Sequence, residues 1–95
     1  MKIIIAGDGK VGLALTRLLS EEGHDLVTID SNREVLERNT QLYDVMAVAG
    51  NCATMATLRE ANVEQADVLI AATSADEINL LCCLTARKLN PSLHT

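Results

Sequence analysis

The feature that most constrains this chain is a short apolar run that leads directly into a glycine-rich turn. Residues 2–6 read Lys-Ile-Ile-Ile-Ala, and residues 7–12 read Gly-Asp-Gly-Lys-Val-Gly. Successive apolar residues, most of them β-branched, favour a strand buried on both faces, as in a parallel sheet covered by helices. We therefore expect a parallel sheet to begin at this run.

The glycine spacing, G-x-G-x-x-G, is typical of turns that bind a pyrophosphate. Gly7 permits the tight turn, Gly9 leaves no Cβ between backbone and pyrophosphate, and Gly12 lets the next helix pack closely. Free N–H groups at that helix's N-terminus favour an anion. Because glycine triples also occur in ordinary loops, the motif requires a strand before it, a helix after it and an acid beyond the next strand. The predicted phosphate loop consists of Gly7, Asp8, Gly9, Lys10, Val11 and Gly12.

Length and composition favour one small globular domain and exclude several partners. The chain has 95 residues, of which 48% are hydrophobic, and Tyr43 is its only aromatic residue. Platforms for stacking nucleic-acid bases are therefore missing, and a net charge of −5 opposes binding to nucleic acid or anionic membranes. No apolar run is long enough to insert into a membrane, so we expect a cytoplasmic protein.

The cysteines and histidines do not form a recognisable reactive set. Cys52, Cys82 and Cys83 lack C-x-x-C spacing and nearby histidines, which argues against zinc and against a disulfide framework. We expect reduced thiols that pack in the core. His24 and His94 are expected at the surface, away from the strand ends.

Hydrophobic patterning divides the rest of the chain into alternating helices and strands. This alternation predicts an α/β fold, a Rossmann-like, doubly wound parallel sheet in the order 3-2-1-4, truncated to about four strands. Since such sheets usually have five or six strands, we expect a single, incomplete domain spanning residues 1–95. Helices are expected at residues 10–22, 33–43, 55–61 and 76–89, and the later strands at residues 25–29, 44–49 and 66–72.

Asp30 follows the second expected strand, near the offset at which dinucleotide-binding folds place a ribose-binding acid. A carboxylate there can accept hydrogen bonds from both ribose hydroxyls and would repel a 2′-phosphate, which favours NAD over NADP. Alternatively, Asp30 only caps the next helix. If Asp30 binds the ribose instead, Ser31 or Asn32 would cap that helix. Ser31 is placed with Asp30 among the candidate site residues.

Two later strand ends are expected at the same edge of the sheet, where ligands of such folds bind. Asn51 could bond the edge of an adenine, and the Thr73 hydroxyl could reach the pyrophosphate or the nearer ribose. Alternatively, Asn51 or Thr54 caps the following short helix, and Thr73 or Ser74 caps the last one.

The expected last helix, at residues 76–89, is apolar nearly all the way round. Such a helix should be buried on two sides, against the sheet on one and against another chain or segment on the other. Together with an unpaired fourth strand, it predicts a homodimer or higher oligomer.

Four stretches together resemble the N-terminal nucleotide-binding domain of TrkA-type potassium uptake regulators, also called the KTN or RCK domain. They read I-I-I-A-G-D-G-K-V-G, G-H-D-L-V-T-I-D, A-G-N-C-A-T and, at residues 58–81, L-R-E-A-N-V-E-Q-A-D-V-L-I-A-A-T-S-A-D-E-I-N-L-L. The resemblance covers residues 1–89. Residues 66–79 discriminate best, because ordinary dehydrogenases share the glycine motif and Asp30.

The resemblance implies a non-enzymatic regulatory subunit that binds NAD or NADH and, in some members, ATP or ADP. It would assemble as dimers into a ring at the inner face of the membrane and gate a potassium transporter subunit. By resemblance, the glycine loop binds phosphate, Asp30 holds the ribose, Asn51 and Cys52 lie at the adenine, and Thr73 faces the pyrophosphate.

One departure qualifies the resemblance, and one further match extends it. Asp8 stands where the family often has a small or apolar residue, and its charge could weaken phosphate binding unless it points to solvent. Asp76, Glu77 and Asn79 match a D-E-x-N segment to which we assign a structural or interfacial role. The alternative function is the cofactor half of an NAD-dependent dehydrogenase, although no catalytic set is visible.

Overall fold

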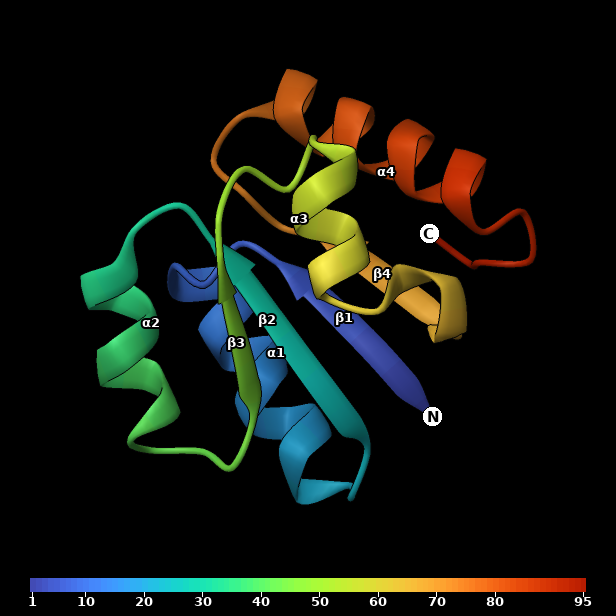
Figure 1. Ribbon diagram of the computed structural model, residues 1–95. Coiled ribbons are helices and arrows are strands. Elements are labelled where there is room, and N and C mark those ends of the chain that lie inside the picture. The colour runs from blue at the N-terminus through green and yellow to red at the C-terminus, as the bar shows by residue number, and fades with distance from the viewer.

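The computed structural model describes residues 1–95 and has a single parallel sheet. Its strand order is β3-β2-β1-β4, which confirms the predicted fold class and order (Figure 1). None of the helices combines the length and apolar character that crossing a membrane requires. The elements are β1 (Lys2–Ala6), α1 (Lys10–Glu21), β2 (Asp25–Asp30), α2 (Arg33–Thr40), β3 (Met46–Ala49), α3 (Met55–Glu60), a 3-10 turn (Val63–Gln65), β4 (Val68–Ala71) and α4 (Asp76–Leu89).

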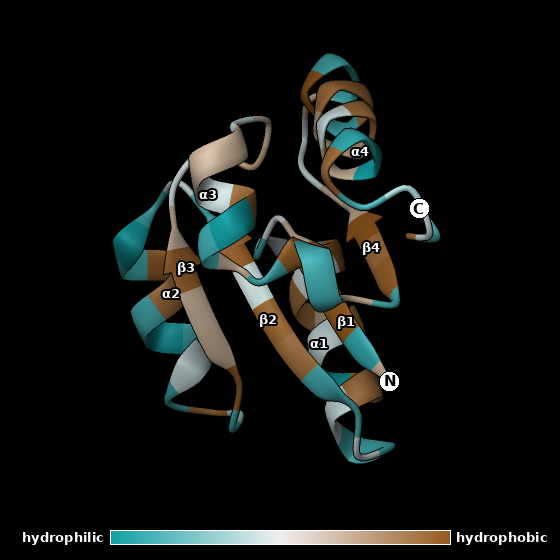
Figure 2. Ribbon diagram, turned by 45° about the vertical axis from the view of Figure 1, so that its right-hand side comes forward, coloured by the Kyte–Doolittle hydropathy of each residue, from teal (hydrophilic) through white to brown (hydrophobic).

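Helices cover both faces of the sheet, with α1 and α2 on one side and α3 and α4 on the other (Figures 1 and 2). The helices change faces because the crossovers are right-handed. The chain first adds β2 and β3 on one side of β1, and it then returns to add β4 on the other side of β1. The isoleucine run contributes to both faces. Ile4 packs in the cluster beneath α3 and α4, whereas Ile3 and Ile5 pack with Leu15 and Leu19 of α1.

Two helices differ from the expected pattern. In α1 the buried positions are Gly12 and Thr16, and Leu18 is exposed. Close packing of α1 requires small residues there, and the buried Thr16 hydroxyl donates to the Gly12 carbonyl at 2.8 Å. Helix α2 ends at Thr40, whose hydroxyl donates to the carbonyls of the preceding turn. Leu42, which the expected range of residues 33–43 places inside the helix, lies beyond its end and is 68% exposed.

The fourth strand is less open than we expected. The Leu69 N–H donates to the His94 carbonyl at 2.8 Å, and the His94 N–H donates to the Asp67 carbonyl at 3.1 Å. Residues near the C-terminus thus occupy part of the outer edge of β4 through one isolated bridge. The buried Asn90 side chain anchors them by donating to the carbonyls of Val63 and Ala66.

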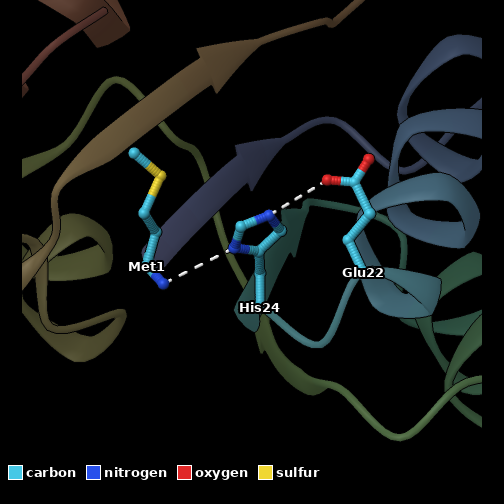
Figure 3. A network of polar contacts seen from close by, with 3 residues as sticks. All are labelled: Met1, Glu22 and His24. Atoms are coloured by element: carbon cyan, nitrogen blue, oxygen red, sulfur yellow. Dashed lines mark hydrogen bonds and ion pairs between the residues drawn. The ribbon is translucent and has the colours of Figure 1, made fainter.

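His24 lies at the amino end of the sheet, opposite the strand ends that carry the predicted site residues. Its Nδ1 is 3.5 Å from the Met1 amino group, and its Nε2 is 3.3 Å from the Glu22 carboxylate (Figure 3). His94 is exposed. Both histidines therefore lie away from the carboxyl ends of the strands, as we expected.

Candidate functional site

A cavity of about 590 Å³ lies at the carboxyl ends of the strands, where the turns after β1, β2, β3 and β4 meet. This is the edge at which open parallel sheets bind ligands, beside the point where the strand order reverses. The lining consists of Gly7, Gly9, Lys10, Val11, Ile29, Asp30, Ser31, Gly50, Asn51, Cys52, Ala72, Thr73, Ser74, Ala75 and Ile78.

Nine of the eleven predicted site residues line this cavity, and the exceptions are Asp8 and Gly12. The structure thus brings together side chains from four separate turns. Most of the lining residues that we did not predict are direct neighbours of predicted ones. Ile78 differs from these, because it lies in the first turn of α4. Only this position near the start of a helix could have indicated from the sequence that Ile78 lines the cavity.

The glycine loop has the geometry that its spacing predicts. Gly7 has φ +107°, a conformation that disfavours residues with a Cβ, and a Cβ there would lie 2.8 Å from the Ala72 carbonyl oxygen. A Cβ on Gly12 would lie 1.8 Å from the Gly7 carbonyl oxygen. At Gly9, in contrast, no atom lies within 4 Å of the Cβ position. The backbone at Gly9 therefore faces open space beside the cavity.

Two helices begin at the cavity without a side-chain cap. The N-cap residues of α1 and α4 are Gly9 and Ala75, and neither provides a capping side chain. The other two helices are capped by Asn32 and Thr54, whose side chains accept hydrogen bonds from backbone N–H groups. The first helical hydrogen bond of α1 runs from the Leu13 N–H to the Gly9 carbonyl. The earlier N–H groups of α1 can therefore bind an anion.

The first turns of these two helices differ in charge. Helix α4 carries Asp76 and Glu77 there, whereas α1 has no acidic residue in its first turn. Acidic side chains near an N-terminus interact favourably with the helix dipole and compete with an external anion. The N-terminus of α1, with the exposed Lys10, is therefore the stronger anion site of the two.

Asp30 joins the glycine loop to the start of α2. One carboxylate oxygen accepts a hydrogen bond from the Asp8 N–H at 2.9 Å, and the other accepts one from the Asn32 N–H at 2.9 Å. Asn32 is the N-cap of α2, accepting from the N–H groups of Glu34 and Val35. The Asp30 side chain is thus turned toward the glycine loop, and the capping role falls to Asn32.

Asp8 lies under the loop rather than in the cavity. Its side chain is only 1% exposed, and neither carboxylate oxygen has a hydrogen-bond partner. Burial raises the pKa of this carboxyl group, and the nearby negative charge of Asp30 adds to the rise. The Asn39 amide lies close enough to offset the rise in part, although it donates to the Asp8 backbone and not to the carboxylate. Asn39 also holds the loop, because its amide donates to the Asp8 carbonyl at 2.9 Å. Asp8 does not point to solvent.

Thr73 is held by Asn79 of α4. The hydroxyl and the N–H of Thr73 both donate to the Asn79 side-chain oxygen, at 2.6 Å and 2.9 Å, and the Asn79 amide donates back to the Thr73 carbonyl. The Thr73 hydroxyl hydrogen is therefore already engaged, and the hydroxyl oxygen also accepts from the Ala75 N–H at 3.3 Å. In this arrangement the hydroxyl has no hydrogen to donate to a pyrophosphate, and its remaining lone pair can accept from a ribose hydroxyl. Asn79 has the structural role that we expected for its segment.

The turn after β3 is organised by its own side chains. The Asn51 side-chain oxygen accepts from the Ala53 N–H at 2.9 Å, and the Thr54 hydroxyl caps α3 by accepting from the Thr57 N–H. Asn51 therefore shapes the turn, and Thr54 caps the helix. Asn51 is exposed at the rim of the cavity, whereas Cys52 is buried beside it.

Comparison with known sequences identifies one family. Residues 3–95 match the sequence model of the TrkA-N domain. A curated relative, a Trk system potassium uptake protein TrkA homolog from Methanothermobacter thermautotrophicus, is 45% identical over 89 residues, which cover 93% of this chain and 41% of the relative. The chain therefore spans less than half the length of this relative.

Two solved structures share the fold across nearly the whole chain. The TrkA-N domain of the inner membrane protein ybaL from Escherichia coli is 27% identical, with a TM-score of 0.89 over 97% of this chain and 67% of the other. The Kef C-terminal domain of Shewanella denitrificans, solved in an AMP-bound form, is 28% identical, with a TM-score of 0.85 over 99% of this chain and 56% of the other.

Proposed function

Because the chain belongs to the TrkA-N domain family, we propose that it is the nucleotide-binding regulatory domain of a potassium uptake system. Its ligand is NAD or NADH, with ATP or ADP as the second choice. The observation that carries this proposal is the hydrogen bond that the Asp30 carboxylate accepts from the Asp8 N–H. It holds the carboxylate in the same cavity as the uncapped N-terminus of α1.

Each part of a dinucleotide has a matching group in the cavity. The pyrophosphate accepts hydrogen bonds from the N–H groups of Gly9, Lys10 and Val11. The adenosine ribose donates its hydroxyls to Asp30, whose oxygens retain acceptor capacity beyond the two backbone bonds. The adenine lies toward Asn51 and Cys52. The AMP-bound form of the Shewanella denitrificans relative supports an adenine nucleotide as the ligand class.

We propose a sensor rather than an enzyme. The titratable side chains that line the cavity are Lys10, Asp30 and Cys52, and the first two are assigned to phosphate and ribose. The histidines lie elsewhere. The relative named above is a potassium uptake protein. A nucleotide that binds two domain arrangements with unequal affinity shifts their populations, and a membrane potassium transporter subunit would respond to that shift.

The proposed setting follows from this role. The domain, residues 1–95 of a longer regulator, is placed in the cytoplasm at the inner face of the membrane, held there by its transporter partner. We propose a homodimer or higher oligomer as the functional unit.

Calorimetric titration of the protein with NAD, NADH, NADP, ATP and ADP tests the ligand. We expect NAD or NADH to bind more tightly than NADP, because a 2′-phosphate would meet the Asp30 carboxylate. A preference for NADP, or no binding by any of the five nucleotides, would contradict the proposed site.

A further inference from the structure

Two of the three thiols belong to one buried cluster beside the cavity, and one of them lines it. Cys52 follows β3 and lines the cavity, whereas Cys82 lies in α4. Both are free, and both belong to the same buried cluster, with exposed fractions of 4% and 0%. Cys83, the next residue along α4, is partly exposed and lines a separate groove.

The register of α4 places Cys82 directly against the turn that holds Cys52. One turn before Cys82, Ile78 lines the same cavity as Cys52. Almost one turn after it, the Thr85 hydroxyl donates to the Ala53 carbonyl at 3.5 Å. The contact after Cys82 and the shared cavity wall before it therefore place this face of the helix opposite the turn.

The two thiols also affect each other's ionisation. A hydrogen bond with the Cys82 thiol lowers the pKa of Cys52 to about 7, against the opposing effect of burial. The same hydrogen bond, with burial, raises the pKa of Cys82. The thiolate is the form that reacts with oxidants, so Cys52 is the better nucleophile of the two thiols.

We propose that Cys52 is an oxidation site opening on the cavity, that its oxidant is a small peroxide, and that Cys82 is the resolving residue that converts it to an intramolecular disulfide. The cavity admits a molecule of this size to a thiol that is otherwise enclosed by protein. The site needs no metal and no second chain.

The chemistry balances with hydrogen peroxide as the oxidant. The Cys52 thiolate attacks one peroxide oxygen, the O–O bond breaks, and the leaving hydroxide takes a proton to form water, so Cys52 becomes a sulfenic acid. The Cys82 sulfur then attacks the Cys52 sulfur, the S–O bond breaks, and the oxygen leaves as a second water with the Cys82 proton. Two thiols are oxidised, and one peroxide is reduced.

Mass spectrometry of the wild-type chain after limited treatment with hydrogen peroxide at pH 7 tests the proposal without depending on a variant. We expect the protein to lose two hydrogens and to yield a peptide pair joined through Cys52 and Cys82. Cys52 should react at least about tenfold faster than Cys83. Oxidation that begins at Cys83, or that leaves Cys52 unreacted, overturns the proposal.

Three variants separate the roles of the thiols. Cys82→Ser keeps a hydroxyl that can donate to the Cys52 sulfur but lacks the resolving thiol, so its reaction should stop at a sulfenic acid on Cys52, which dimedone traps. Cys52→Ala should abolish the fast reaction. Cys83→Ala is the matched control and should form the disulfide at the wild-type rate. A folded Cys82→Ser variant without sulfenic acid at Cys52 would contradict the assignment.

Adding NAD to the peroxide reaction tests whether a bound nucleotide protects Cys52. Only this last experiment rests on the proposed function. A nucleotide in the cavity covers Cys52, so the reaction should slow by the fraction of sites occupied. If the disulfide forms but saturating NAD gives no protection, the oxidation site stands and the placement of the nucleotide is wrong.

Discussion

At the scale of single residues, Asp30 has two tasks that one side chain rarely combines. Its oxygens accept hydrogen bonds from the Asp8 N–H in the glycine loop and from the Asn32 N–H before α2. The same carboxylate lines the cavity. A substitution at Asp30 therefore disturbs both the loop and the proposed ribose contact, and an experiment must separate the two effects.

We predict that Asp30→Ala weakens NAD binding by about 1–3 kcal/mol, because the ribose hydroxyls lose a charged acceptor. Asn32→Ala is the matched control. It removes the cap of α2 and should cost about 1 kcal/mol of stability, but Asn32 does not line the cavity, so NAD affinity should persist. Calorimetry and thermal unfolding measure the two quantities, and equal NAD binding by both variants would count against the ribose contact.

Asp8 makes the stability of the protein depend on pH. Because burial raises the pKa of its carboxyl group above the ordinary value of 3.8, the folded state binds its proton more tightly than the unfolded state does. This stabilisation is complete below pH 3.8 and is lost as the pH rises through the raised pKa. At neutral pH the buried carboxylate is therefore a cost to folding.

We predict that Asp8→Asn stabilises the protein at pH 7, on the order of 1 kcal/mol, by removing a buried charge. The gain should shrink as the pH falls toward 4. Asp44→Asn, at an exposed position, should leave stability unchanged at both pH values. Denaturant unfolding at several pH values measures these differences, and a destabilised Asp8→Asn variant at pH 7 would show that the carboxylate has a partner.

At the scale of elements, the glycine loop and α1 offer a pair of substitutions with opposite expectations. A Cβ at Gly12 would lie 1.8 Å from the Gly7 carbonyl oxygen, so α1 would have to move. A Cβ at Gly9 meets no protein atom within 4 Å. Packing therefore requires a glycine at position 12, whereas Gly9 leaves space that a ligand can occupy.

We predict that Gly12→Ala destabilises the protein by about 2 kcal/mol or more through overpacking. Gly9→Ala should keep stability within about 0.5 kcal/mol of the wild type yet reduce NAD affinity by at least about tenfold, because its methyl group blocks the approach of the pyrophosphate. Unfolding curves and calorimetry check both values. Wild-type NAD affinity in Gly9→Ala would exclude this loop as the phosphate site.

The elements could largely be predicted from the sequence, whereas several of their ends could not. Apolar patterning and capping residues located every strand and α-helix, but not the 3-10 turn at Val63–Gln65. The patterning missed Thr16, because a buried threonine that bonds the Gly12 carbonyl resembles a surface residue in the sequence. It also placed Leu42 inside α2, although the Thr40 hydroxyl bonds at the end of that helix.

At the scale of the whole molecule, α4 presents an apolar face that this chain does not cover. Leu80, Leu81 and Leu84 are 61%, 50% and 59% exposed, while Cys82 and Ala86 on the opposite side are buried. Exposed leucines that gather on one helix favour association with another surface.

We predict that the protein sediments as a dimer or larger species at micromolar concentration, and that Leu84→Glu shifts it toward monomer by placing a charge on this face. Leu42→Glu is the control, because Leu42 is equally exposed but lies outside α4. A wild-type protein that sediments only as a monomer would contradict the prediction.

The order of the strands, and the edge of the sheet at which the candidate residues meet, could be predicted from the sequence because handedness and strand count allow few topologies. The contacts within the site did not follow. The Asn79 bonds to Thr73, the burial of Asp8 and the meeting of Cys52 with Cys82 all depend on how turns far apart in the chain pack together. The residue types at these positions do not indicate contacts between such distant parts of the chain.

The most direct test of the nucleotide site is to titrate ¹⁵N-labelled protein with NAD and with NADP and to follow each backbone amide by NMR. We predict that NAD shifts the amides of Gly9, Lys10 and Val11 most strongly, together with those around Asp30, and that NADP produces the same shifts only at higher concentration. Shifts confined to the outer face of α4, or equal responses to both nucleotides, would contradict binding at the glycine loop with Asp30 as the ribose acceptor.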